Sequence, residues 1–197
     1  MKIAVFMGGT SSEKEISLRS GEAVLESLQR QGYDAYGVVL DENNQVTAFL
    51  ENDYDLAYLV LHGGNGENGK IQAVLDILGK KYTGSGVLAS ALTMDKNKTK
   101  QIAENIGIRV PKSYRDLDSI ERFPVIIKPV DEGSSKGLFL CNNKEEAGEA
   151  LKKLRKPIIE DYIVGEELTV GVLNGKALGV LKIIPQADVL YDYDSKY

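Results

Sequence analysis

The sequence predicts an α/β fold: a parallel α/β domain, then a small α+β unit, then the first hairpin of a further, incomplete domain. Three observations predict it. Strand-like apolar runs alternate with helical runs through about residue 93, which is typical of a parallel sheet covered on both faces. Residues 123–164 follow the order strand, loop, strand, helix, strand, which favours an antiparallel sheet. Asn174-Gly175 separates two apolar runs, which is a strong hairpin signal.

The first domain, residues 1–93, opens with the apolar run "KIAVFMG", which is too short for a signal sequence and indicates a buried strand. Ile16, Val24 and Leu28 then recur near helical spacing, and Gly32 closes the predicted helix. The elements expected here are strands at 2–8, 33–41 and 54–64, a helix at 12–32, a short helix or turn at 46–53 and a helix at 69–82.

The second domain, residues 94–165, is introduced by a helix over "ALTMDKNKTKQIAENIG", which ends at Gly107. The elements expected after it are strands at 123–129, 138–143 and 157–164, a loop at 131–137 and a helix at 144–155. The third segment, residues 166–197, contains the hairpin at Asn174-Gly175. A lone hairpin is marginally stable in water, so we expect this one to belong to a larger sheet.

Composition excludes several classes of function. The chain has 197 residues and a net charge of −5, which disfavours a nucleic-acid binder because phosphate backbones require a basic face. No apolar stretch approaches the length of a membrane span. The single cysteine, Cys141, permits no internal disulfide and is expected to have no chemical role. We therefore expect a cytoplasmic protein with no nucleic-acid or membrane partner.

Two glycine-rich stretches follow predicted strands of the first domain. In "GGTSSEKEIS", Ser11 or Ser12 can cap the next helix, whose N-terminus favours anions, although Glu13 and Glu15 could equally serve only to offset the helix dipole. In "LHGGNGENG", the only histidine, His62, lies where open α/β sheets hold ligands. A lone histidine is often structural, but here an imidazole that binds a substrate carboxylate is at least as plausible.

The stretch "VIIKPVDEGSSKG" is the clearest phosphate signal. Lys128 ends a buried strand, where a lysine is costly unless it meets an anion. The following loop supplies amide groups, Ser134, Ser135 and Lys136, and such loops can cover nucleotide phosphates. The stretch is not a Walker A sequence. The alternative is a plain turn with a solvated lysine.

The stretch "PIIEDYIVGEE" is a strand that runs into a glycine hinge. Its backbone could pair with an adenine edge while Glu167 reaches ribose hydroxyls. Without further context, the same residues would form an ordinary interdomain linker.

Together, these stretches resemble the ATP-grasp superfamily and, within it, the D-alanine–D-alanine ligases. The motifs occur in that family's order and approximate spacing along essentially the whole chain. Two further stretches, "YTGSGVLASALTMDK" and "YDYDSKY", distinguish this ligase from other members of the superfamily. The resemblance implies a central ATP-grasp domain and, from residue 166, the start of a C-terminal ATP-grasp domain with part of its lid loop.

The resemblance also implies a reaction. ATP phosphorylates the carboxylate of one D-alanine, the amine of a second D-alanine attacks the acyl phosphate, and the dipeptide enters peptidoglycan synthesis. Transfer of this kind depends mainly on positioning and charge neutralisation. The resemblance implies a role for each of the following residues: Glu13 and His62 at the first D-alanine, Lys96, Lys128 and Lys196 at ATP phosphates, Ser134 and Ser135 in the covering loop, Glu160, Asp161, Tyr162 and Ile163 at adenine, Glu167 at ribose, and Tyr197 bonded to Ser134, which leads on to Glu13.

The chain departs from the family pattern in one respect. The family's magnesium ligands, an Asp, a Glu and an Asn, would follow residue 197, as would a phosphate-binding arginine. We therefore expect Mg²⁺ for the family, no metal ligands in this chain, and little activity of the chain alone. The resemblance further implies a homodimer through the first domain. Two alternatives stay open: another ATP-grasp carboxylate–amine ligase, and an inactive module that binds a nucleotide or D-alanine.

Overall fold

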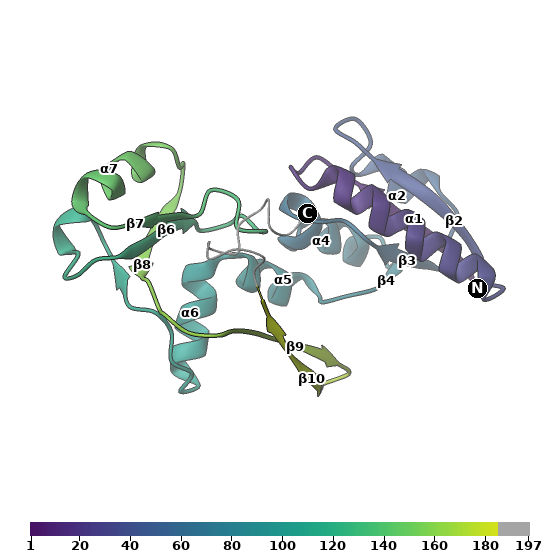
Figure 1. Cartoon of the computed structure of the whole chain (residues 1–197). Coiled ribbons are helices and arrows are strands. Elements are labelled where there is room, and N and C mark those ends of the chain that lie inside the picture. The colour runs from purple at the N-terminus through teal and green to yellow at the C-terminus, as the bar shows by residue number, and fades with distance from the viewer. Residues whose placement is uncertain (185–197) are drawn as a thin grey trace. The chain divides into compact units, whose positions relative to one another are not determined.

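A computed structural model describes residues 1–184 of the chain. These residues fall into two compact units, Met1–Asn105 and the residues from Ile106 onward, each described by itself below (Figure 1). None of the helices in residues 1–184 has both the length and the apolar character needed to cross a bilayer. The predicted division at residues 93/94 and 165/166 stays a prediction.

The first unit is built on a parallel four-stranded sheet with the order β2-β1-β3-β4. Its strands are β1 (Lys2–Gly8), β2 (Asp34–Leu40), β3 (Leu56–Leu59) and β4 (Lys81–Tyr82). The chain moves to one side of β1 to form β2 and to the other side to form β3. The C-terminal ends of β1 and β3 therefore flank a switch point, where open α/β sheets bind ligands.

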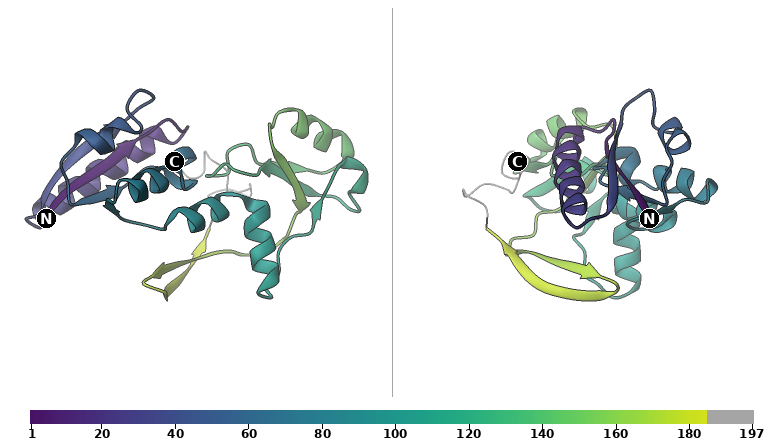
Figure 2. Two further views of the ribbon diagram at one scale, coloured as in Figure 1. Left: turned by 180° about the vertical axis from the view of Figure 1, so that it is seen from behind. Right: turned by 90° about the vertical axis from the view of Figure 1, so that its right-hand side faces the viewer.

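Helices cover both faces of this sheet, as the alternating pattern predicts (Figure 2). Odd-numbered side chains of β1, such as Val5, pack against α1 (Lys14–Arg30). Even-numbered ones, such as Phe6, pack against α2 (Thr47–Glu51) and α4 (Lys70–Ile77). Successive strand residues point to opposite faces, so the apolar run of β1 supplies two cores at once.

The prediction of one helix, at residues 91–107, is wrong. Residues 91–107 do not form a single helix but belong to α5 (Val87–Met94) and α6 (Lys96–Asn105). The backbone between them is extended at Asp95, with ψ of 107°. The Asp95 carboxylate accepts a hydrogen bond from the amide of Lys98 at 3.1 Å. Because an aspartate that binds an amide three residues later starts a new helix, the chain turns here although both flanks are helix-forming.

Two other elements of the first unit are shorter than predicted. The helix expected at 69–82 ends at Ile77, and its last two residues form β4. The strand expected at 54–64 is only Leu56–Leu59, and a short helix, α3 (Gly64–Glu67), follows it. Glycines permit this tight turn after the strand, since Gly63 and Gly64 both have positive φ.

The second unit contains an antiparallel sheet with the order β5-β8-β6-β7, as predicted. Its elements are β5 (Ser113–Tyr114), a 3-10 turn η1 (Leu117–Ser119), β6 (Val125–Pro129), β7 (Phe139–Cys141), α7 (Lys144–Lys152) and β8 (Pro157–Asp161). Val125, Ile127 and Ile159 form one face of the sheet and pack against α7. The neighbouring positions Ile126, Lys128 and Glu160 lie on the opposite face.

The predicted hairpin is confirmed. It consists of β9 (Glu167–Leu173) and β10 (Lys176–Ile183), which form a separate two-stranded sheet. Asn174 and Gly175 have φ of 49° and 74°, and two left-handed residues in succession are what a type I′ turn requires. The predicted α/β fold class, with its parallel and antiparallel sheets, is thereby confirmed.

Candidate functional site

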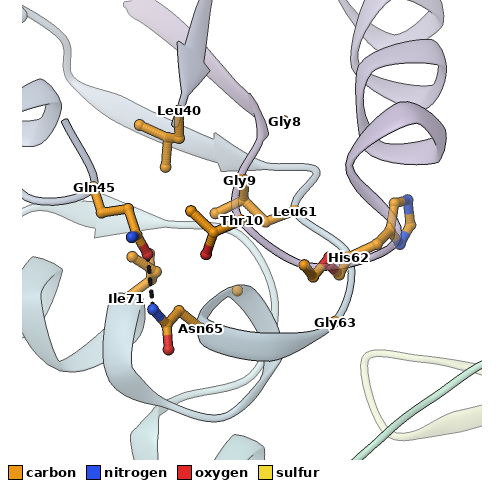
Figure 3. Close-up of a pocket in the computed structure, with 12 residues that line it drawn as sticks. Gly8, Gly9, Thr10, Leu40, Gln45, Leu61, His62, Gly63, Asn65 and Ile71 are labelled. Atoms are coloured by element: carbon orange, nitrogen blue, oxygen red, sulfur yellow. Dashed lines mark hydrogen bonds between the residues drawn. The ribbon is translucent and has the colours of Figure 1, made fainter. Parts of the chain in front are cut away.

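The loops that follow β1 and β3 come together at the switch point of the first unit (Figure 3). The hydroxyl of Ser11 donates to the carbonyl of His62 at 2.5 Å and accepts from the amide of Glu13 at 3.1 Å. The two loops line one pocket, whose walls are Gly8, Gly9, Thr10, Ser11, Leu40, Gln45, Leu61, His62, Gly63, Asn65, Gly66 and Ile71. Both glycine stretches singled out from the sequence thus belong to one place.

A buried serine fixes the strand ends beneath these loops. Ser17, in the first turns of α1, is fully buried. Its hydroxyl donates to the carbonyl of Val60 at 2.6 Å and accepts from the amide of Gly8 at 2.9 Å. Ser17 therefore joins β1, the loop after β3 and α1, and it determines the spacing between the two glycine loops.

Glu13 lies at the N-terminal end of α1 and is only 8% exposed. Neither Ser11 nor Ser12 takes this helix-capping position, contrary to one of the two alternatives from the sequence. The carboxylate of Glu13 lies directly against the backbone of Gly63: a Cβ at that glycine would be 2.6 Å from Oε2. Because Gly63 also has φ of 66°, both the contact and the backbone conformation require glycine.

His62 is held between two side chains. Its Nδ1 is 3.8 Å from Oε1 of Glu67, and its Nε2 is 3.4 Å from the hydroxyl of Ser20. The pKa of Glu67 is raised, chiefly by burial and further by the charge of Glu13, while the Gly63 amide and His62 act in the opposite direction. Two carboxylates and the imidazole thus form one charged cluster, which suits a small ligand with both an ammonium and a carboxylate.

The other side of the pocket is neutral. Figure 3 shows the ring of His62 turned away from Gln45 and Asn65, which bond to each other. The Asn65 amide donates to Oε1 of Gln45 at 2.7 Å. Leu40 and Ile71 complete this side. Of the charged cluster, His62 lines this pocket, whereas Glu13 and Glu67 are not among its lining residues.

In the second unit, Lys128 and Glu160 form an ion pair on the sheet face opposite α7. Ile126 is directly opposite Glu160 in the β6–β8 register, so Lys128 is its diagonal neighbour. The Glu160 side chain is 6% exposed and that of Lys128 is 24% exposed. The sequence assigned these residues to ATP separately, and the structure brings them together.

The serine loop next to this pair has an unusual backbone. Ser134 and Ser135 have φ of 50° and 57°, which non-glycine residues rarely adopt. The Lys136 amide donates to the carbonyl of Gly133, and the Leu138 amide donates to that of Ser135. The loop therefore contains a tight turn, and backbone amides of turns can form sites that bind anions. Strained conformations of this kind cluster at ligand-binding loops.

The end of β8 is tied down on both sides. The Asp161 amide donates to the carbonyl of Lys112 at 2.9 Å, and the Tyr162 amide donates to that of Pro124 at 3.4 Å. The Ile163 amide has no acceptor in the part of the chain that the structure describes, and its residue is 60% exposed. Of the three amides predicted to meet adenine, that of Ile163 is therefore the one available to a ligand.

The remaining predicted residues are placed as follows. Lys96 is the first residue of α6, and the exposed Glu167 is the first residue of β9. Lys196 and Tyr197 lie outside the described residues, as does any contact of Tyr197 with Ser134. Among residues 1–184, no group of three or more His, Cys, Asp or Glu side chains could hold a metal ion.

Two family models match the chain. The D-ala D-ala ligase N-terminus matches residues 2–50 and 44–85, and the D-ala D-ala ligase C-terminus matches residues 81–197. The chain belongs to the D-alanine–D-alanine ligase family. The predicted membership and ligase class are thereby confirmed.

Relatives named D-alanine–D-alanine ligase match along the whole chain. The protein from Fusobacterium nucleatum is 88% identical, and the chain covers 69% of its length. The protein from Aquifex aeolicus is 42% identical, and the chain covers 71% of its length. The chain thus spans about seven tenths of these ligases.

Solved ligase structures share the fold. The D-alanine–D-alanine ligase of Bacillus anthracis matches the whole chain with a TM-score of 0.87 and 35% identity, over 68% of that ligase. The structure of the Bacillus anthracis ligase complexed with ATP matches 97% of the chain and 68% of that ligase, with a TM-score of 0.84 and 33% identity. ATP therefore binds a close structural neighbour.

The sequence prediction missed several residues of this ligase site. Ser17, Ser20 and Glu67 hold the loop and histidine that the motifs identified. Glu67 follows His62 by five residues in a glycine-rich loop, and this proximity was a usable signal. Nothing in the sequence pointed to Ser17, since a serine on the apolar side of an amphipathic helix has no distinctive pattern.

Proposed function

We propose that the protein takes part in the ATP-dependent joining of two D-alanine molecules into D-alanyl-D-alanine, for peptidoglycan synthesis. The observation that carries the proposal is the Lys128–Glu160 ion pair beside the strained serine loop, in a chain of the D-alanine–D-alanine ligase family. This proposal is supported by a partly buried lysine at the end of β6, the serine loop that follows it and the end of β8, which all belong to the second unit.

The first D-alanine is assigned to the charged cluster of the first unit. Glu13 would pair with the substrate ammonium, and the imidazole of His62 would donate to its carboxylate. Glu67, 3.8 Å from Nδ1, would orient the ring, and Nε2 would exchange its 3.4 Å contact with the Ser20 hydroxyl for the substrate carboxylate. The glycine loops then allow the backbone to approach a substrate as small as an amino acid.

The nucleotide is assigned to the second unit. Lys128 would exchange part of its contact with Glu160 for ATP phosphate, and the loop with Ser134 and Ser135 would cover the phosphates. The backbone at 161–163 would meet adenine, and Glu167 the ribose. Lys96 and Lys196 would add positive charge at the phosphates. Tyr197 would bond to Ser134, a link supported only by the family resemblance.

The chemistry follows from this arrangement. A carboxylate oxygen of the first D-alanine attacks the γ-phosphorus of ATP, and the bond to the ADP oxygen breaks. The amine of the second D-alanine then attacks the acyl carbon, loses a proton, and displaces phosphate. The protein contributes alignment and positive charge rather than a covalent intermediate.

Mg²⁺ is expected for the family, but the residues that the structure describes do not fit it, since they offer no cluster of three suitable side chains. We assign no step to it. Low turnover by the 197-residue chain alone stays a prediction. Coupled ADP release with D-alanine and Mg²⁺ measures it, and a rate near that of a full-length relative would contradict it.

Two properties carried by the resemblance also stay proposals: a homodimer through residues 1–93 and a cytoplasmic location. Light scattering during size-exclusion chromatography tests the first. The alternative acceptor of a related carboxylate–amine ligase is tested by product analysis with a panel of D-amino and D-hydroxy acids. A binding module without turnover would bind ATP and release no ADP.

The test of the nucleotide site is calorimetry with a non-hydrolysable ATP analogue. Lys128→Met should weaken binding by at least about tenfold, since a charge-assisted contact to phosphate is lost. Lys152→Met is the matched control, because Lys152 is an exposed lysine of the same unit that pairs with Glu149. Equal affinities of the two variants would contradict the assignment of Lys128.

A further inference from the structure

Asp161 carries a buried charge that the proposed function does not use. The residue is 5% exposed. The hydroxyl of Tyr114 donates to its Oδ1 at 2.7 Å, and the Arg122 guanidinium pairs with both of its oxygens. Arg122 is the chief cause that holds the pKa of this carboxyl below its usual range, against the effect of burial. The carboxylate is therefore charged and fully engaged at neutral pH.

These three residues, which we call the Asp161 clamp, come from three separate segments. Tyr114 is in β5, Arg122 precedes β6, and Asp161 is the last residue of β8. The backbone is tied at the same point: the Asp161 amide donates to Lys112 and the Tyr162 amide donates to Pro124. The strand end is thus held by side chain and main chain together.

The clamp adjoins the residues assigned to the nucleotide but points away from them. Glu160, which pairs with Lys128, has its side chain on one face of β8, and the side chain of Asp161 is on the other. Tyr114 belongs to the core on the α7 side. Asp161 can therefore act on a nucleotide only through the backbone that it fixes.

We propose that the Asp161 clamp positions the backbone of residues 160–163 for recognition of the adenine base; this inference rests on the proposed function. The regular strand ends at Asp161 and the next begins only at Glu167, so the sheet does not itself fix the amide of Ile163. Recognition of a base edge by backbone groups requires their placement within a fraction of an ångström. A charged anchor at the last paired residue supplies that constraint.

A role in stability alone is a weaker account of the clamp. The Arg122 side chain is 68% exposed, and ion pairs with so exposed a partner contribute little net stability. The backbone of Asp161 is already held without the clamp, since Asp161 lies opposite Val125 in the β6–β8 register and its amide donates to Lys112. A positioning role and a merely structural role differ in one measurable respect. Substitution of a positioning residue weakens recognition of the base and leaves the affinity for phosphate unchanged.

The experiment compares ATP, GTP and inorganic tripolyphosphate by calorimetry on the 197-residue chain. Tyr114→Phe removes one hydroxyl and keeps the ring in the core. It should weaken ATP binding by about tenfold, the scale of one hydrogen bond to a charged group. Tripolyphosphate affinity should be unchanged, and the preference for ATP over GTP should shrink. Asp161→Asn should act in the same direction.

Arg115→Gln is the matched control, since Arg115 follows Tyr114, contacts Asp116 and lies 90% exposed. It should bind all three ligands like the unaltered chain. If Tyr114→Phe weakened the binding of ATP and of tripolyphosphate equally, or weakened neither, the proposed role of the clamp would be contradicted. If the unaltered chain binds tripolyphosphate and shows no preference for ATP over GTP, the proposed role of the clamp is contradicted while the proposed phosphate site is supported. If the unaltered chain binds none of the three, the proposed nucleotide site itself fails.

Discussion

At the scale of single residues, the candidate site depends on charges that are close together and partly buried. Glu13 and Glu67 lie near each other beside His62, and the pKa of Glu67 is raised chiefly by burial and further by repulsion from Glu13. A substrate ammonium would relieve this repulsion, because it adds positive charge between two carboxylates. The raised pKa of Glu67 also predicts how stability depends on pH.

Burial is the main cause of the raised pKa of Glu67, so the folded protein binds this proton more tightly than the unfolded chain does. In the window from the ordinary glutamate pKa up to the folded value, stability therefore falls as pH rises. Glu67→Gln removes this contribution, and its unfolding free energy should decrease less with pH across that window. Urea unfolding at several pH values measures it.

Glu22→Gln, at an exposed position of α1, is the control for loss of a charge and should preserve the pH dependence. A Glu67→Gln profile parallel to that of the unaltered chain would show that the Glu67 environment is not as described.

At this scale, the sequence predicted the candidate ligand-binding residues but not the residues that hold their loops and strands in place. Glu13, His62 and Lys128 stand in motifs whose glycines or buried strands mark them. Ser17 and Tyr114 could not be found in this way, since Ser17 bonds to Val60, 43 residues away, and Tyr114 bonds to Asp161, 47 residues away. Contacts over such separations depend on the tertiary arrangement.

At the scale of elements, the close approach of α1 to β1 determines where the first glycine loop lies. Gly21, inside α1, faces the central strand, and a Cβ there would be 2.5 Å from Cβ of Met7. Hydrophobic periodicity predicted the helix and both strands, but it could not predict Asp95, where a side-chain hydrogen bond divides a helical stretch into α5 and α6. A hydrogen bond from a short polar side chain to a nearby backbone amide can override helix propensity at a single residue.

Gly21→Ala should destabilise the first unit by about 1–3 kcal/mol, because the added methyl group overpacks α1 against β1. Alanine is otherwise the better helix former, so the sign of the effect tests the packing directly. Chemical denaturation measures the change.

Gly148→Ala in α7 is the matched control. A Cβ there would meet only Cδ1 of Leu117, at an ordinary 3.7 Å. It should stabilise the protein by about 0.5–1 kcal/mol through helix propensity alone. A neutral or stabilising Gly21→Ala would contradict the close packing of α1 on β1.

At the scale of the whole molecule, the two units contain different kinds of candidate site. The first has a cluster of two carboxylates and an imidazole, and the second has a partly buried lysine, a loop with left-handed serines and a fixed strand end. Under the proposed function, the first would bind an amino acid and the second a nucleotide. The order of strands and helices predicted the two kinds of sheet, since period and alternation are local properties of sequence. The register that makes Lys128 and Glu160 diagonal neighbours depends on a strand pairing across about thirty residues, which no local pattern specifies.

Hydrogen–deuterium exchange of the 197-residue chain, with and without a saturating non-hydrolysable ATP analogue, tests the central claim most directly. A nucleotide held by the serine loop and the end of β8 should slow amide exchange at residues 131–137 and 160–163 and leave exchange in the exposed hairpin at 168–183 unchanged. Binding that leaves exchange in both of the first two segments unaltered would contradict the account.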